Sequence, residues 1–263
     1  MEDIGETNKQ KFEGYLRNSK NVPFVIKFSS LLPLPVYSQI SKEWGCLSQW
    51  KEAIGNCKVN GITILFNLME QIVFILQKVT LKKKDENRNT SILMKIREYI
   101  DLFEEIEDFI SKKVKDPTHE NARFEDLDLS YIPYCQDINL NDPQFSNLHS
   151  KLFDSILPHL PFLEKEAPSR FLFLGPKGSS TPIHVDGCGT HGFLMLFCGE
   201  KRVQLWSSEQ SYLGISRLCQ EDSATVELKE MEILYIPSGM AHQVLNVSKC
   251  VAIQYVYKCP NCF

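Results

Sequence analysis

The second half of the chain consists of short apolar runs separated by glycine, proline and polar residues. From about Phe171 onward the runs are FLFLG, PIHVDG, GFLMLFCG, KRVQLW, ATVEL, EILYIPSG, HQVLN and VAIQYVY. Runs of this length with turn residues between them are typical of the strands of a β-sandwich or β-barrel. No motif recurs at a fixed period, which excludes a solenoid.

The first half carries longer periods that favour helices. Val22–Phe28, opened by a proline, is an extended apolar segment and predicts a strand. Apolar positions at helical spacing predict a helix around Lys9–Arg17, a buried face around Trp44–Trp50 and a long helix from Thr90, which Thr90 or Ser91 would cap. The apolar stripe of that long helix comprises Leu93, Ile96, Ile100, Phe103, Ile106 and Ile110.

The segment 62–81, ITILFNLMEQIVFILQKVTL, is nearly long enough to cross a bilayer. It also contains Glu70 and Lys78, and a charged side chain in the middle of a membrane span is costly. We therefore expect a soluble segment, with a short helix from Ile62 followed by a buried strand near 72–78.

These patterns predict an α+β fold. Residues 1–130 would form an α-rich N-terminal part with strands near 22–28 and 72–78, and this part would pack on a β-barrel core formed by residues 131–263. We expect the two parts to form one cooperative unit.

The composition is that of a folded globular chain. Of 263 residues, 43% are hydrophobic and 24% are charged, and 29 Lys+Arg against 33 Asp+Glu leave a formal net charge of −4. That balance excludes a polycation that coats nucleic acid, so we expect no direct nucleic-acid partner and no membrane partner. A chain of this length buries enough surface to fold without disulfides or a structural metal.

Nine cysteines are scattered through apolar contexts, and their number is odd. The first residues lack a basic region followed by an apolar one, so we expect no secretory signal and a reducing compartment, the cytoplasm or the nucleus. Most of the thiols are then expected to be buried and unpaired. Cys259 and Cys262 at the end of the chain have the CxxC spacing of half a zinc site.

Two histidines and an aspartate among the predicted strands have the pattern of a metal site. Residues two apart in a strand share a face, so His184 and Asp186 would project together into the barrel while Val185 points away. His242 follows the predicted strand Glu232–Ile236. Two imidazoles and one carboxylate form the facial triad that holds non-haem Fe(II). An HxD pair also occurs by chance, and zinc is a competing metal, although a zinc hydrolase would need a general base for which we see no candidate.

The residues around these three resemble the jumonji-C family of Fe(II)- and 2-oxoglutarate-dependent oxygenases. The similar segments are Thr181–Asp186 (TPIHVD), Cys198–Arg202 (CGEKR) and Tyr235–Asn246 (YIPSGMAHQVLN), and upstream Val22–Lys27, Trp44–Trp50, Met94–Ile100 and Tyr134–Asp137 occur in the expected order. Phe173–Ser179, Cys198-Gly199 and Pro237–Gly239 are most similar to the branch that hydroxylates a lysine in the translation termination factor. The resemblance implies a double-stranded β-helix of the cupin or jelly-roll type.

The resemblance also implies roles for individual residues. His184, Asp186 and His242 match the iron ligands, and Lys201 matches the lysine that pairs with the distal carboxylate of 2-oxoglutarate; a solvated hairpin turn is the alternative for Lys201. Thr181 and Tyr134 match hydroxyl donors to the same co-substrate. Tyr131 is the alternative to Tyr134 for this role. The remaining predicted pocket residues are Gln136, on the strand face of Tyr134, and Gln254, where relatives place a polar residue facing the co-substrate.

The sequence departs from the family pattern in two ways. Leu194 stands where some relatives carry an asparagine that reaches the co-substrate, and the span from Asp186 to His242 is short. Apolar residues of one strand are expected to shield the reaction. They are either Phe193, Met195 and Phe197 or the alternate residues Leu194 and Leu196.

The resemblance implies an oxygenase that uses Fe(II), O₂ and the co-substrate 2-oxoglutarate to hydroxylate a side chain of a protein or peptide partner. The expected target is a lysyl side chain, with the translation termination factor as a candidate. Two alternatives remain open: a jumonji-C lysine demethylase, which uses the same chemistry on an N-methyl group, and a catalytically inactive binding protein with the same fold.

Overall fold

The computed structural model describes residues 22–64, 90–114, 134–160, 169–187 and 189–258. Several sequence-based predictions lie outside these residues and remain predictions. They are the helix at Lys9–Arg17, the strand at 72–78, the alternative pocket residue Tyr131, and the pair Cys259 and Cys262.

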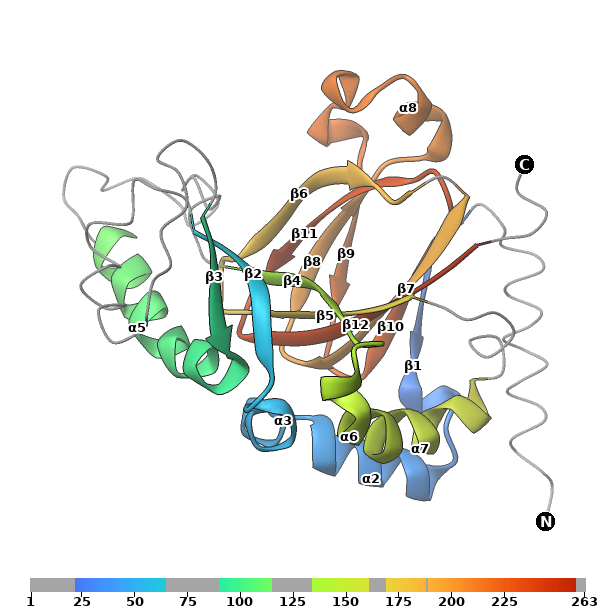
Figure 1. Cartoon of the computed structure of the whole chain (residues 1–263). Coiled ribbons are helices and arrows are strands. Elements are labelled where there is room, and N and C mark those ends of the chain that lie inside the picture. Colours follow the sequence, from blue (N-terminus) through green and yellow to red (C-terminus); the bar gives the residue numbers. More distant parts are fainter. Residues whose placement is uncertain (1–21, 65–89, 115–133, 161–168, 188, 259–263) are drawn as a thin grey trace, which may run out of the picture.

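Two antiparallel sheets face each other and enclose the interior of a barrel (Figure 1). The strands of the larger sheet are, in spatial order, β1 (Phe24–Lys27), β10 (Glu232–Ile236), β7 (Thr190–Cys198), β12 (Cys250–Lys258), β5 (Ser169–Gly175), β4 (Tyr134–Asn139), β2 (Lys58–Ile64) and β3 (Thr90–Lys95). Those of the smaller sheet are β6 (Ser180–Val185), β11 (Ala241–Asn246), β8 (Lys201–Leu205) and β9 (Ala224–Leu228). Each apolar run of the second half forms a strand, as predicted.

Helices cover the outer face of the larger sheet (Figure 1). Those of the N-terminal part are η1 (Phe28–Ser30), α2 (Leu34–Trp44), α3 (Leu47–Ile54) and α5 (Ile96–Val114). A run of short helical turns follows β4, namely η6 (Pro143–Phe145), α6 (Ser146–Leu148), η7 (His149–Phe153), α7 (Asp154–Ile156) and η8 (Leu157–His159). The connection between β8 and β9 contains α8 (Ser208–Tyr212), η10 (Ile215–Arg217) and η11 (Gln220–Asp222).

Side chains of β7 alternate between the two faces of the larger sheet. Phe193, Met195 and Phe197 belong to the core between this sheet and the helices. Leu194 and Leu196 belong to the core inside the barrel. Of the two sets that the sequence left open, the second faces the barrel interior, because a strand repeats every second residue.

The two tryptophans of the N-terminal part are buried, as predicted, but they lie on two helices. Trp44 ends α2 and Trp50 lies in α3, and their ring centroids are 4.9 Å apart in an edge-on arrangement. The Nε1 of Trp50 donates a hydrogen bond to the carbonyl of Trp44 at 2.8 Å, and its ring packs edge-on against Phe197 at 5.5 Å. This contact anchors α3 to β7.

Two predicted helix starts are wrong. Residues Thr90–Lys95 form β3, and α5 begins only at Ile96, so neither Thr90 nor Ser91 caps a helix. Ile62, expected to begin a helix, lies in β2 and pairs with Ile92 of β3. Pairing between strands supplies backbone hydrogen bonds that no local pattern reveals, and β-branched residues suit strands. From Ile96 the predicted stripe is buried through Ile106.

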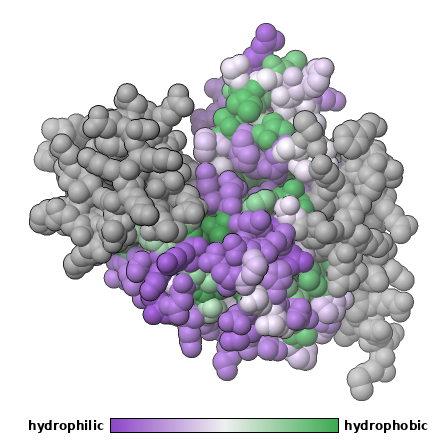
Figure 2. All heavy atoms as spheres, viewed as in Figure 1, coloured by the Kyte–Doolittle hydropathy of each residue, from purple (hydrophilic) through white to green (hydrophobic). Residues whose placement is uncertain are grey.

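Figure 2 shows hydrophobic residues at the top of one face, over the connection that contains α8. Among the exposed residues there are Leu213 and Ile215, which are 62% and 41% exposed. The connection leaves β8 next to Leu205, which pairs with His242 of β11. Within the described residues, no helix is long and apolar enough to cross a membrane.

Candidate metal and co-substrate site

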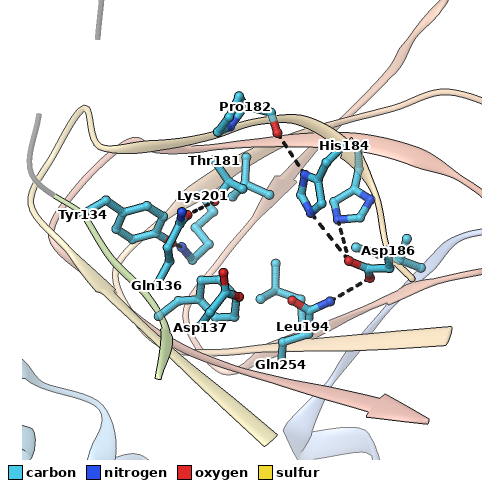
Figure 3. Close-up of a pocket in the computed structure, with 14 residues that line it drawn as sticks. Tyr134, Gln136, Asp137, Thr181, Pro182, His184, Asp186, Leu194, Lys201 and Gln254 are labelled. Atoms are coloured by element: carbon cyan, nitrogen blue, oxygen red, sulfur yellow. Dashed lines mark hydrogen bonds and ion pairs between the residues drawn. The ribbon is translucent and has the colours of Figure 1, made fainter. Parts of the chain in front are cut away.

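A cavity of about 300 Å³ opens between the two sheets (Figure 3). The eight residues that the sequence predicts for the site all line it, together with apolar and acidic neighbours. The lining comprises Tyr134, Gln136, Asp137, Phe173, Thr181, Pro182, His184, Asp186, Leu194, Lys201, Ile236, His242, Val244 and Gln254. Its volume lies at the lower end of the range for small-molecule sites.

His184, Asp186 and His242 meet at one end of this cavity. His184 of β6 pairs directly with His242 of β11, so the two rings lie beside each other with centroids 4.2 Å apart. The Oδ1 of Asp186 lies 3.5 Å from the Nε2 of His184 and 3.9 Å from the Nε2 of His242. One ligand atom from each residue falls within 4.8 Å of the others, a spacing that one metal ion can bridge.

Backbone carbonyls orient both imidazoles. The Nδ1 of His184 lies 2.9 Å from the carbonyl of Pro182, and the Nδ1 of His242 lies 3.2 Å from that of Met240. Because a carbonyl only accepts, each Nδ1 carries a proton, and each Nε2 faces Asp186 as the atom that would bind a metal. Histidines that bind metals show this arrangement, so the donor set fits a divalent ion.

The three ligands have shifted pKa values. Burial lowers the pKa of His242, and its two ligand neighbours act in opposite directions on it. Burial also lowers the pKa of His184, but the hydrogen bond and charge of Asp186 and the Pro182 carbonyl outweigh it, so the net shift is upward. For Asp186, burial raises the pKa, and hydrogen bonding with His184, the histidine charges and Gln254 together lower it below its usual value. The carboxylate is therefore ionised at neutral pH, as a metal ligand must be.

Gln254 of β12 holds the second oxygen of the same carboxylate. Its amide Nε2 donates to the Oδ2 of Asp186 at 2.9 Å, which leaves Oδ1 directed at the two imidazoles. The sequence predicts that Gln254 faces the co-substrate. The side chain does line the cavity, but its hydrogen bond goes to the metal ligand, because β12 and β7 place it beside the end of β6.

Lys201 of β8 lies on the opposite wall of the cavity and is 1% exposed. Its ammonium donates to the hydroxyl of Tyr134 at 3.1 Å and to the Oδ1 of Asn246 at 2.6 Å. Both partners are neutral, and no described carboxylate lies within ion-pair distance of Lys201. Burying a charge is costly unless it is paired, so this cation fits an anionic ligand that enters the cavity. The buried position also excludes the alternative of a solvated hairpin turn.

The remaining predicted residues lie between Lys201 and the histidines. The Oγ1 of Thr181 donates to the Oε1 of Gln136 at 3.3 Å. Thr181 pairs with Val244, and His184 pairs with His242, so β6 contains one more residue than β11 between these two pairs. The resulting bulge allows Thr181 and His184, three residues apart, to face the same cavity.

Sequence reasoning assigned no role to two polar residues of this region. Asn246 is 1% exposed and holds Lys201, while its Nδ2 donates to the hydroxyl of Ser179 at 2.8 Å. Alternation from His242 along β11 would have placed Asn246 on the cavity face. Asp137 also lines the cavity, and no periodicity predicts its position.

Comparisons with known proteins agree with the resemblance to the jumonji-C family. A protein of Danio rerio named 2-oxoglutarate and iron-dependent oxygenase JMJD4 is 22% identical over 265 residues, which cover 90% of this chain and 58% of that protein. A protein of Arabidopsis thaliana named lysine-specific demethylase JMJ21 is 26% identical over 181 residues, which cover 53% of this chain and 19% of that protein. The chain thus spans little more than half of the length of the first relative and about a fifth of the length of the second. No family model matches it.

The fold is similar to that of a solved structure of YcfD, a ribosomal oxygenase from Escherichia coli, in complex with cobalt and succinic acid. The TM-score is 0.50 at 10% sequence identity, and the match covers 95% of this chain and 52% of that one. The likeness confirms the predicted fold class, a double-stranded β-helix with helices contributed by the N-terminal part.

Proposed function

We propose that the chain is a jumonji-C oxygenase that depends on Fe(II) and 2-oxoglutarate and hydroxylates a protein side chain. One observation carries this proposal. A cluster of two histidines and one carboxylate lies on one side of a cavity, and a buried lysine without a described ion-pair partner lies on the other. A divalent metal fits the first element, and a dicarboxylate that reaches from the metal to Lys201 fits both. The names of the relatives support the same chemistry.

Each wall of the cavity has a separate task in this proposal. His184, Asp186 and His242 would hold the metal on one face and leave the other free for ligands. Lys201, held by Tyr134 and Asn246, would bind the distal carboxylate of 2-oxoglutarate. When bound, the iron supplies the activation of O₂, coupled to conversion of 2-oxoglutarate into succinate and CO₂ and to insertion of oxygen into a C–H bond.

The apolar part of the lining excludes water from the reacting groups. Phe173, Leu194 and Ile236 line the cavity and are almost completely buried. A dry site strengthens the electrostatic interactions of Lys201 and of the metal, and it limits side reactions. Leu194, which replaces a polar residue of some relatives, adds to this apolar wall.

The substrate in this proposal is a lysyl side chain of a protein, and the translation termination factor is the first candidate because of the motifs shared with that branch of the family. The described cysteines are unpaired, which suits a reducing compartment such as the cytoplasm or nucleus.

A lysine demethylase is the second candidate function. The name of the Arabidopsis relative JMJ21, lysine-specific demethylase, favours it. Hydroxylation of an N-methyl group releases formaldehyde, whereas hydroxylation of a side-chain carbon does not. Formaldehyde measured with methylated and unmethylated peptides therefore separates the two functions.

The first experiment is anaerobic calorimetry of 2-oxoglutarate binding, with Fe(II) or with Mn(II) as a redox-silent substitute. We expect binding that depends on the metal in the wild-type protein and is lost in His184→Ala. Lys201→Met should weaken binding by about 30-fold or more, because it removes one partner of a buried charge pair. The apo form of Lys201→Met should unfold at an unchanged or higher temperature, since an apolar group replaces an unpaired buried charge.

Lys229→Met is the matched control, because Lys229 lies on the surface and pairs there with Glu200. It should bind 2-oxoglutarate as the wild type does. Absence of metal-dependent binding in the wild type would contradict the proposal and favour the third reading, an inactive binding protein with the same fold.

A further inference from the structure

Asp137 occupies a bulge in β4. Cys135 pairs with Leu174 of β5 and Ile138 pairs with Leu172, so Gln136 and Asp137 together stand opposite Phe173 alone. Asp137 has a φ angle of 58°, which is a left-handed conformation. Glycine adopts this conformation freely, asparagine and aspartate adopt it occasionally, and other residues adopt it rarely. Bulges of this kind re-aim a side chain and are frequent beside active sites.

The bulge changes the face on which the carboxylate lies. Cys135 and Ile138 are buried in the core between the larger sheet and the helices. Strict alternation would place Asp137 on that apolar face together with Cys135. Instead Gln136 and Asp137 both line the cavity (Figure 3). Asp137 is also exposed to solvent, so we place its carboxylate at the cavity mouth.

No described residue forms a hydrogen bond or an ion pair with the carboxylate of Asp137. Partial burial raises the pKa of this carboxyl group, while the charge of His184 lowers it and that of Asp186 raises it. Lys201, the lysine that lines the same cavity, donates its hydrogen bonds to Tyr134 and Asn246 instead. Among the described residues, none holds the acid at the mouth in an ion pair, and the protein keeps it there in a backbone conformation that disfavours most side chains.

The charges of the loaded cavity show what is missing. Lys201 and a divalent metal supply three positive charges, and Asp137, Asp186 and dianionic 2-oxoglutarate supply four negative ones. The difference is about one negative charge. A side chain with a single positive charge, entering past Asp137, would neutralise it.

We propose that Asp137 is a specificity-determining residue that binds the cationic end of the substrate side chain at the cavity mouth, and so selects lysyl or arginyl side chains over neutral ones. This inference rests on the proposed function and adds to it the residue that would select the charge of the substrate side chain. The bulge supplies the position, and the absence of a described partner leaves the carboxylate available for a charge-assisted hydrogen bond.

The test uses the full chain loaded with Mn(II) and 2-oxoglutarate, and capped pentapeptides of glycine with a central lysine, arginine or norleucine. Binding is followed by calorimetry and by broadening of the side-chain proton signals, which Mn(II) causes only in nearby nuclei. We expect the lysine or the arginine peptide to bind at least about tenfold more tightly than the norleucine peptide. The lysine and arginine arms decide which cation is preferred.

Asp137→Asn removes the charge and keeps the shape, and asparagine tolerates the left-handed conformation. It should abolish the preference for the cationic peptide. Asp108→Asn makes the same change on the exposed surface of α5 and should behave as the wild type does.

Norleucine binding as tight as that of both cationic peptides, binding of no peptide at millimolar concentration, or an unaltered preference in Asp137→Asn would overturn the inference. Failure of the proposed function has a different signature, namely no uptake of Mn(II) and 2-oxoglutarate by the wild type. In that case calorimetry of the three peptides with the metal-free protein still decides whether Asp137 selects a cation.

Discussion

The three candidate metal ligands illustrate how neighbours set the protonation of single residues. His242 is almost completely buried, and its pKa is lowered. His184 is more exposed and hydrogen-bonds with Asp186, and its pKa is raised. In the absence of metal, His184 therefore keeps its second proton up to a higher pH than an ordinary histidine does, and a metal ion must displace that proton where it is bound.

Metal binding should release a proton from His184 near neutral pH. Its contribution to the stability of the metal-free fold is fully present below the ordinary histidine pKa of about 6.5, and it is lost as the pH rises through the raised folded-state value. At about pH 6.5 we expect Mn(II) binding to release about one proton or less, and the affinity to increase with pH. Calorimetry in two buffers of different ionisation enthalpy measures the release. A binding heat that is independent of the buffer at this pH would contradict the assignment.

At the scale of elements, bulges and close approaches between strands shape the cavity. The bulge in β6 brings Thr181 to the face of His184, and the bulge in β4 brings Asp137 to the cavity mouth. A glycine in β7, Gly192, allows a close approach beside the metal ligands. A Cβ atom built on Gly192 would lie 3.0 Å from the Nε2 of Gln254 and 3.4 Å from the Oδ2 of Asp186.

Gly192→Ala should therefore weaken metal binding. The new methyl group pushes the Gln254 amide away from Asp186, and loss of a hydrogen bond to a metal ligand lowers affinity by about tenfold or more. Gly187→Ala is the matched control, since a Cβ atom there meets nothing within 4 Å. Titration with Mn(II) distinguishes the variants. Equal affinity of both would show that Gln254 does not hold the carboxylate.

At the scale of the whole molecule, the N-terminal part shares sheet and core with the barrel. β1 pairs with β10, and β2 pairs with β4 and β3, so strands of the N-terminal part form both edges of the larger sheet and strands of the barrel core form its centre. One hydrophobic core runs from Phe28 in the N-terminal part to Tyr255 in the last described strand. The proposed division at residue 130 therefore separates segments of sequence that fold against each other.

We expect a single unfolding transition of the full chain. In urea, circular dichroism of the sheets and fluorescence of Trp44 and Trp50 should change together, because both report one core. A fragment of residues 131–263 should not fold, since it would expose Phe193, Met195 and Phe197 to water. Two separate transitions, or a folded fragment, would contradict the proposal of one cooperative unit.

The local sequence determined those features that depend on short-range periodicity. The apolar runs predicted the strands of the second half, because alternation and turn residues act over a few positions. The same alternation placed His184 and Asp186 on one face. The resemblance to the jumonji-C family, and not periodicity, indicated Lys201, Thr181, Tyr134, Gln136 and Gln254, which the structure brings to one cavity.

Tertiary structure decided the features that depend on pairing between distant segments. Thr90–Lys95 became a strand because β2 lies beside it, although its apolar spacing fits a helix. Gln254 of the larger sheet reached Asp186 at the end of β6, and Asn246 reached Lys201 because the register between β11 and β8 places the two residues opposite each other. Asp137 faces the cavity because of a register shift between β4 and β5. Register is a property of two strands together, so one stretch of sequence read by itself does not contain it.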